Sequence, residues 1–111
     1  YLPCIKGPEF SLLNKEHQRR LFTPFTVSDH NNRVGYRLKE CLENNLPSIL
    51  SSAVMPGTVQ LTPSGKCIIL LQDCQITGGY PRILQLSDTA IARVSQKISG
   101  DKIQFRLEQY S

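Results

Sequence analysis

The chain has 111 residues, of which 40% are hydrophobic and 20% charged, and its formal net charge is +4. This length suits one domain that buries a core without a disulfide or metal staple. No apolar run approaches the roughly 18 residues that a membrane-spanning helix needs, so we expect no membrane insertion. The thirteen basic residues are scattered among nine acidic ones. We therefore interpret the positive charge as surface charge and expect no nucleic-acid partner.

The cysteines and histidines predict neither a disulfide scaffold nor a metal site. There is no paired C-x-x-C spacing, and neither histidine lies close to a cysteine pair. We expect free thiols in a reducing cytoplasm, with Cys67 and Cys74 acting as small buried hydrophobic residues. Residues 1–8 contain no initiator Met and no signal-peptide pattern. They predict a cut inside a longer chain, at a point where a strand begins.

The first half of the chain predicts strands, one helical segment and a long loop. Residues 2–6 have the character of a strand, closed by Gly7-Pro8. Apolar residues at helical spacing over 9–22 predict one amphipathic helix, continuous or broken. Two strands follow at 25–28 and 35–39, separated by the polar loop 29–32. The segment 40–52 is weakly patterned and predicts a meandering loop with at most one helical turn.

The second half is more regular. A strand at 58–61, a turn at 62–65 and a strand at 66–72 predict an antiparallel pair, and the unbroken apolar run 67–71 predicts burial on both faces. A strand at 82–86 and a helix at 89–96, capped by Ser87-Asp88, come next. A half-buried strand follows at 103–107. About six strands and two short helices indicate a mainly β chain, a single domain over 1–111 folded as a closed or half-closed β-barrel.

Two arginines near the start of the second strand pair are candidate anion ligands. Arg33 and Arg37 are four residues apart, with a glycine between them. In a strand both side chains would point to one face, where their planar donors suit a carboxylate or a phosphate. The alternative is that each arginine pairs with a nearby carboxylate or lies in solvent.

The segment Asp73-Cys-Gln-Ile-Thr-Gly-Gly-Tyr80 is the most specific candidate site. It follows a strand predicted to be buried and brings together a carboxylate, an amide, a hydroxyl and two glycines. Gly78 and Gly79 permit positive φ and let backbone N–H groups converge on an oxygen-rich ligand. The alternative is a simple glycine hinge. Gln60 lies between Val59 and Leu61 in the predicted strand 58–61, so its side chain points to the other face and meets either a pocket or solvent.

The known catalytic motifs are missing from the sequence. It contains no Gly-x-Ser-x-Gly elbow, no phosphate-binding Gly-x-x-x-x-Gly-Lys loop, no metal helix and no cysteine with a convincing histidine partner. The residues alone therefore predict a β-rich domain with a polar pocket. The catalytic residues stay unknown.

Three blocks in order resemble the allophanate hydrolase subunit 2 family: Asn32-Arg-Val-Gly-Tyr-Arg-Leu38, Pro56-Gly-Thr-Val-Gln60 with Pro63 and Gly65, and Asp73-Cys-Gln-Ile-Thr-Gly-Gly-Tyr-Pro81. The family includes KipA-type proteins, the C subunit of 5-oxoprolinase and part of the carboxyltransferase region of urea carboxylase. The resemblance spans nearly the whole chain and implies a cyclophilin-like β-barrel, the C-terminal half of a longer protein. Val34, where the family usually has Met, and residues 29–32 depart from its pattern.

The resemblance implies three functions. The first is part of an ATP-dependent hydrolase resembling 5-oxoprolinase, which opens 5-oxoproline to glutamate together with a partner, the B subunit. The second is carboxyl transfer from biotin, as in urea carboxylase. The third is a KipA-like regulator that antagonises a KipI-like inhibitor of a histidine kinase. Whether the parent is an enzyme is left open. We expect the fragment itself to bind no cofactor and to be inactive alone, with ATP or biotin acting in the full complex.

We expect one shared pocket for a lactam or amide substrate. In this hypothesis the arginines hold a carboxylate, and Asp73 or Gln75 addresses an amide N–H. The predicted substrate-binding residues are Arg33, Arg37, Gln60, Asp73, Gln75, Thr77, Gly78, Gly79 and Tyr80.

Overall fold

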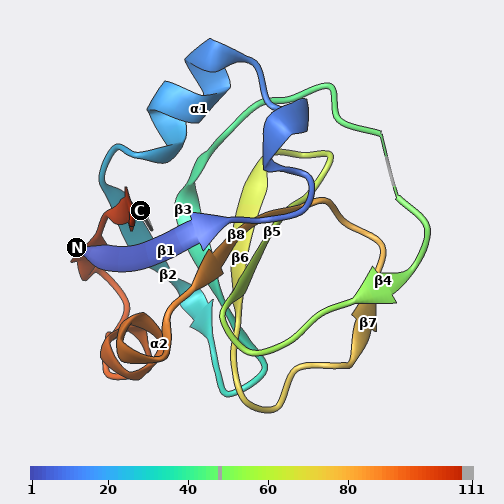
Figure 1. The fold of residues 1–111 in the computed structure, drawn as a ribbon. Coiled ribbons are helices and arrows are strands. Elements are labelled where there is room, and N and C mark those ends of the chain that lie inside the picture. The colour runs from blue at the N-terminus through green and yellow to red at the C-terminus, as the bar shows by residue number, and fades with distance from the viewer. Residues whose placement is uncertain (48, 109–111) are drawn as a thin grey trace.

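The computed structural model describes residues 1–47 and 49–108. Its main element is an eight-stranded sheet in the order β10-β1-β8-β5-β6-β3-β2-β9. The sheet curls into a nearly closed barrel, which confirms the predicted mainly β, cyclophilin-like architecture (Figure 1). The strands of this sheet are β1 (Leu2–Lys6), β2 (Phe25–Asn31), β3 (Gly35–Cys41), β5 (Thr58–Leu61), β6 (Lys66–Leu70), β8 (Arg82–Leu86), β9 (Lys102–Ile103) and β10 (Phe105–Leu107).

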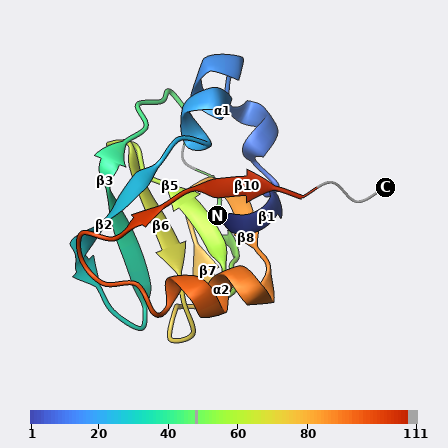
Figure 2. The ribbon, with the colours of Figure 1, turned by 90° about the vertical axis from the view of Figure 1, so that its left-hand side faces the viewer.

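The C-terminal segment bridges the two edges of the sheet. Ile103 in β9 pairs with Phe25 in β2, whereas Phe105 in β10 pairs in parallel with Leu2 in β1. Only Gln104 separates the two short strands, and Figure 2 shows the segment crossing from β2 to β1. The predicted alternation of 103–107 is confirmed, because Ile103 and Phe105 are buried. The single strand predicted there is wrong, because the segment changes partners at Gln104.

The barrel interior holds the core. Successive side chains of a strand point to opposite faces, so one set from each strand fills the interior. β6 lies between β5 and β3, and its inward Cys67 and Ile69 are fully buried. Its outward Ile68 is half-buried and its outward Leu70 is buried. Burial of both faces confirms the prediction made from the unbroken apolar run.

Two helical segments close the barrel ends. The predicted helix over 9–22 is broken, with a 3-10 turn η1 (Phe10–Leu12) followed by α1 (Lys15–Leu21), whose N-cap Asn14 accepts a bond from His17 N at 2.8 Å. α2 (Asp88–Val94) begins after Ser87, whose Oγ accepts a bond from Ala90 N at 3.2 Å. This confirms the predicted cap, although the helix ends two residues earlier than expected. No helix in the described part of the chain is long and apolar enough to cross a membrane.

A second, two-stranded sheet lies outside the barrel sheet and was not predicted. β4 (Ser52–Ala53) pairs with β7 (Thr77–Gly78) and stands apart from the other strands in Figure 1. The predicted loop 40–52 is therefore wrong at both ends, since β3 continues through Cys41 and β4 begins at Ser52; Ser48, also in that range, lies outside the described residues. The predicted loop 29–32 is wrong too, because β2 continues to Asn31 across a register shift.

Candidate functional site

A row of four residues crosses the outer face of the barrel. Arg37 in β3 pairs with Ile68 in β6, which pairs with Gln60 in β5, which in turn pairs with Arg82 in β8. Residues opposite one another in paired strands share a face of the sheet. The neighbours of Gln60, Val59 and Leu61, are fully buried in the core, so this row faces outward. We call these four residues the outer wall.

Gln60 is a buried polar residue on that outer wall. Its exposed fraction is only 4%, and its Nε2 has no hydrogen-bond partner among the described residues. An unpaired buried amide costs about 1–3 kcal/mol, so such a group needs an explanation. A bound molecule that presents an acceptor would remove this cost.

Gly78 of β7 covers the Gln60 amide. A β-carbon built at position 78 would stand 2.5 Å from Gln60 Nε2, closer than real atoms approach. Gly78 and Gly79 do not use the positive φ that glycine permits, which in the described chain is found at Gly57, Gly65 and Gly100. A side chain at position 78 would force the Gln60 amide to move, whereas the backbone angle of Gly78 would not exclude one. The structure thus brings Gly78 and Gln60 together.

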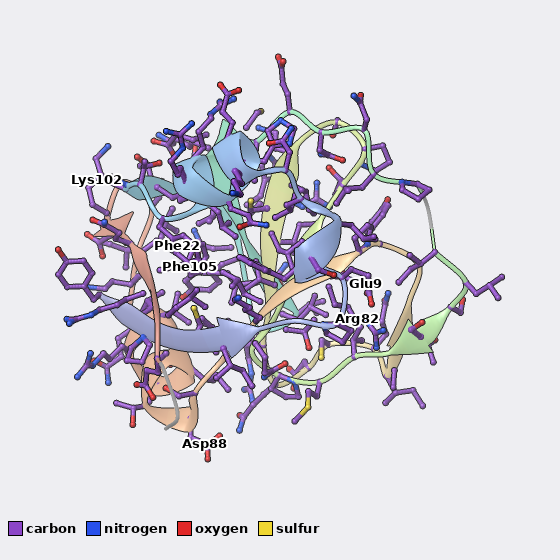
Figure 3. The ribbon with its side chains drawn as sticks, turned by 45° about the horizontal axis from the view of Figure 1, so that its top comes forward. Glu9, Phe22, Arg82, Asp88, Lys102 and Phe105 are labelled. Atoms are coloured by element: carbon purple, nitrogen blue, oxygen red, sulfur yellow. The ribbon has the colours of Figure 1, made fainter. Side chains whose placement is uncertain are left out.

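Arg82 anchors the other end of the outer wall, and the sequence reasoning did not include it. Arg82 Nε and Nη2 donate to the Glu9 carboxylate at 2.8 and 3.0 Å, and Arg82 Nη1 donates to Ala53 O at 3.0 Å. Figure 3 shows Glu9 and Arg82 side by side. Both side chains are largely buried, and the bonds from Arg82 lower the pKa of Glu9 below its usual value. This pair ties η1, β8 and β4 together. Alternation along 82–86 would place Arg82 on the same face as the buried Leu84, and a register shift in the β5–β8 pairing brings it opposite Gln60 instead.

Arg33 lies apart from the outer wall. It sits in the turn before β3 begins, so the strand geometry that would align it with Arg37 does not apply. Arg33 Nε lies 3.2 Å from Asp73 Oδ2, and Asp73 N donates to Arg33 O at 3.0 Å. Both side chains are more than half exposed, so this ion pair adds little stability. Arg33 and Asp73, two of the predicted site residues, therefore contact each other. Arg33 follows the alternative given for the arginines, in which it pairs with a nearby carboxylate.

Arg33 borders a cavity at the end of the barrel, which we call the end cavity. The cavity measures about 710 Å³ and lies between the β2–β3 turn and α2. Its lining includes the apolar side chains of Tyr36, Leu71 and Ile91. The Tyr36 hydroxyl donates toward Ser95 O and Lys97 O, which fixes α2 against β3. Arg37 and Gln60 do not line this cavity.

The remaining predicted residues lie on or beside the outer two-stranded sheet. Thr77 pairs with Ala53 in the β4–β7 ladder, and its side chain is exposed. Gln75 and Tyr80 flank β7 and are also exposed, whereas Gly79 is half-buried. A groove of about 400 Å³ is lined by residues of β1, β5 and β8 and by β4 with its flank. Its lining includes Lys6, Ala53, Met55, Thr58, Arg82 and Gln85.

The possible metal ligands of the described residues are dispersed, and two of the four thiols are deeply buried. Within residues 1–47 and 49–108, no three His, Cys, Asp or Glu side chains gather closely enough to hold a metal ion. The four cysteines are free. Burial raises the pKa of Cys67 to about 12 and that of Cys4 to about 11, so neither thiol is reactive at neutral pH. Cys74 is half-buried, less than the burial expected for it.

Comparison with known proteins places this geometry in a family. A model of the family "Carboxyltransferase domain, subdomain A and B" matches residues 1–107. The C subunit of 5-oxoprolinase from Escherichia coli is 34% identical over 105 residues, covering 92% of this chain and 34% of that protein. The protein of the same name from Haemophilus influenzae is 40% identical over 83 residues, covering 73% and 27%. The chain therefore spans about a third of the length of the curated relatives it matches.

Solved structures agree on the fold. The protein TTHA0988 superposes with a TM-score of 0.78 at 30% identity, over 95% of this chain and 20% of that one. Urea carboxylase of Kluyveromyces lactis superposes with a TM-score of 0.81 at 20% identity, over 94% of this chain and 10% of that one. At that identity the second match shows the fold alone. The family resemblance expected from the three sequence blocks is confirmed, and the chain belongs to the carboxyltransferase domain family that includes the 5-oxoprolinase C subunits and the allophanate hydrolase subunit 2-like proteins.

Proposed function

We propose that this domain helps a 5-oxoprolinase-type complex bind 5-oxoproline, which the complex opens to glutamate with ATP. Two relatives that share a third or more of their matched residues with the chain are named as C subunits of 5-oxoprolinase. In this proposal ATP is bound outside the residues of this chain. In this proposal the parent protein acts as one subunit of a hydrolase.

The observation that carries the proposal is the unpaired Gln60 amide on the outer wall. A lactam has a carbonyl that accepts hydrogen bonds, and Gln60 Nε2 is a buried donor without a partner in the described chain. Satisfying this donor removes a cost of about 1–3 kcal/mol, which favours binding of an acceptor. Since Gly78 covers the amide, the β4–β7 sheet must shift to admit the substrate.

Arg37 supplies the matching charge. It lies two strands from Gln60 on the same outer face, a separation of about 10 Å between backbones. Arg37 is exposed, and none of the ion pairs formed by the described residues involves it. An arginine side chain can span part of this separation and hold a carboxylate in bidentate fashion. We assign the substrate carboxylate to Arg37 and the lactam carbonyl to Gln60.

The outer sheet offers further contacts to the same ligand. Gln75 and Thr77 carry a side-chain acceptor and a hydroxyl near Gly78, and we assign the lactam N–H to Gln75. Asp73 is the weaker choice for this role because Arg33 already occupies its carboxylate. Arg33 and Asp73 would contribute only from the rim. Tyr80 and Gly79 would line the same side of the ligand.

The test uses the full-length parent protein with its partner subunits and follows ATP hydrolysis driven by 5-oxoproline. Arg37→Ala should raise KM about 10- to 100-fold, because it removes one charged hydrogen-bonding group worth about 1.5–3 kcal/mol. Arg37→Lys should recover part of the loss. Arg19→Ala, at an exposed position of α1, serves as the matched control. An unchanged KM in Arg37→Ala would refute the assignment of the carboxylate.

The family description favours a second candidate, carboxyl transfer. The family is named for a carboxyltransferase domain, so the same wall could bind an amide or urea nitrogen that receives a carboxyl group from biotin. Turnover of urea or an amide in the presence of a biotin carboxylase, without turnover of 5-oxoproline, would favour it. Tight partner binding with no turnover of any lactam, amide or urea would favour the KipA-like regulatory function.

A further inference from the structure

Two short segments outside the barrel carry no charge. Residues 49–56 and 74–80 contain β4 and β7 with their flanks, and we call them the strap. None of their 15 residues is Asp, Glu, Lys, Arg or His, although 20% of the whole chain is charged. A solvent-facing surface normally carries mixed charge. An uncharged stretch of this length on the outside of the fold therefore requires an explanation.

The strap also exposes large apolar side chains. Leu50 is 90% exposed and Ile76 is 81% exposed, and Met55 and Tyr80 are exposed as well. These are four of the nine exposed large hydrophobic residues found in the described chain. Scattered single residues of this kind are normal, but a gathering on one element marks an interaction site.

Two residues of the strap are packed against the rest of the fold. Val54 and Gly78 are buried against the barrel, and Arg82 Nη1 holds Ala53 O at 3.0 Å. The two segments are joined by Val54 N to Ile76 O at 3.1 Å and Ile49 N to Gly79 O at 3.2 Å. These bonds hold the strap backbone in place, while Leu50 and Ile76 stay exposed. In Figure 1 the strap lies across the molecule from α2 and the chain ends.

We propose that the strap is the docking surface for another protein subunit, one that presents an uncharged apolar patch. This inference rests on the proposed function, in which the parent works as one subunit of a complex. Depletion of charge and enrichment in apolar and aromatic side chains is the composition of an interface centre. A charged partner surface would lose hydration here without gaining an ion pair, so the occupant must be uncharged at this point.

The position of the strap links docking to the outer wall. Gly78 belongs to the strap and lies on the Gln60 amide. A partner seated on the strap therefore covers the residue that screens that amide from the outside. Interfaces take about 20–30 residues from each side, so the exposed apolar residues of the strap form the centre and neighbouring polar residues the rim.

The test measures association of the full-length parent with its partner subunits in the absence of substrate. The variant is Leu50→Asp/Ile76→Asp, and the matched control is Leu12→Asp/Ile98→Asp, two exposed apolar residues outside the strap. Isothermal titration calorimetry should show the strap variant binding at least about 100-fold more weakly, the loss expected for residues at an interface centre. The control should bind like the wild-type protein.

Three results would overturn the proposal. The first is wild-type affinity in the strap variant. The second is a strap variant whose thermal stability falls in the parent alone while its affinity is unchanged, which would mean that the parent covers its own strap. The third is a wild-type parent that associates with none of the subunits.

Association and turnover are read separately in this design. If the strap variant loses its partner while the wild-type complex turns over no 5-oxoproline, the docking surface stands and the proposed function fails. If turnover is normal and the strap variant binds normally, the proposed function stands and the docking surface fails.

Discussion

Gly78 lies directly against Gln60, with the position of a missing β-carbon 2.5 Å from the amide nitrogen. The two residues come from different sheets, and 18 positions separate them in the chain. Their contact closes the outer sheet onto the barrel and screens a donor that has no partner among the described residues. The segment 73–80 therefore contacts the barrel at Gln60 in β5.

This contact predicts a non-additive pair of substitutions. Gly78→Ala should destabilise the chain by about 1–3 kcal/mol, because the new methyl group displaces the Gln60 amide. Gln60→Ala/Gly78→Ala should cost less than the sum of the two single changes, since the shortened side chain leaves room for the methyl group. Urea unfolding measures all three. Gly79→Ala is the control, because its β-carbon would meet nothing closer than 3.6 Å. Equal losses at positions 78 and 79 would contradict the contact.

The Glu9–Arg82 pair predicts a strong dependence of stability on both partners. Glu9→Gln should lower the free energy of unfolding at pH 7 by about 3 kcal/mol, because it leaves the largely buried guanidinium without its counter-charge. Arg82→Met should have a similar effect. Glu16→Gln, at an exposed position of α1, should change stability by less than about 0.5 kcal/mol. Urea unfolding at pH 7 measures these differences.

The same pair predicts a response to acid. Arg82 lowers the pKa of Glu9 in the folded chain, so the stabilisation is fully present above the unfolded pKa of about 4.3. It is lost as the pH falls below that value and through the folded pKa. The wild-type chain should therefore lose more stability between pH 5 and pH 3 than Glu9→Gln does. Unfolding midpoints in urea across this range check the sign, and parallel curves would contradict it.

The four thiols should divide into two groups. Cys41 is exposed and Cys74 half-buried, whereas Cys4 and Cys67 are buried. Burial raises the pKa of Cys4 to about 11 and that of Cys67 to about 12, and it also raises the pKa of Cys74. Iodoacetamide at pH 8 should label Cys41 first and Cys74 more slowly, and should reach Cys4 and Cys67 only after unfolding. Mass spectrometry of peptides from native and denatured samples measures this order. Early labelling of Cys67 would contradict the position of β6 in the barrel wall.

Tyr36 should stabilise the wall of the end cavity. Its hydroxyl lies 3.1 Å from Ser95 O and 2.9 Å from Lys97 O, which are acceptors at the end of α2. Tyr36→Phe should cost about 1–2 kcal/mol and speed hydrogen exchange around 95–97, because those carbonyls lose their donor. Tyr80→Phe, at an exposed position, is the matched control. Equal exchange in the two variants would show that the hydroxyl does not hold the helix end.

Local patterns in the sequence determined most of the strands. Strand 58–61 and strand 82–86 have the bounds expected, and the cap at Ser87 is as predicted, because turn residues and alternation act over a few neighbours. β4 and β7 escaped prediction because strands of two residues contain no period. The broken pairing at Gln104 also has no local signal. The change of partner arises because residues 102–107 pair with β2 at one edge of the sheet and with β1 at the other.

The candidate site shows the same division. The sequence by itself determined the family, through three short blocks in order, and it singled out Gln60 and the segment 73–80. Only the tertiary structure decided which of these residues meet: Gln60 with Gly78, Arg33 with Asp73, and Arg37 on the outer wall without Arg33. Glu9 and Arg82, 73 positions apart, meet only because the barrel closes. Such contacts depend on long-range strand pairing and burial, which residues near in sequence do not encode.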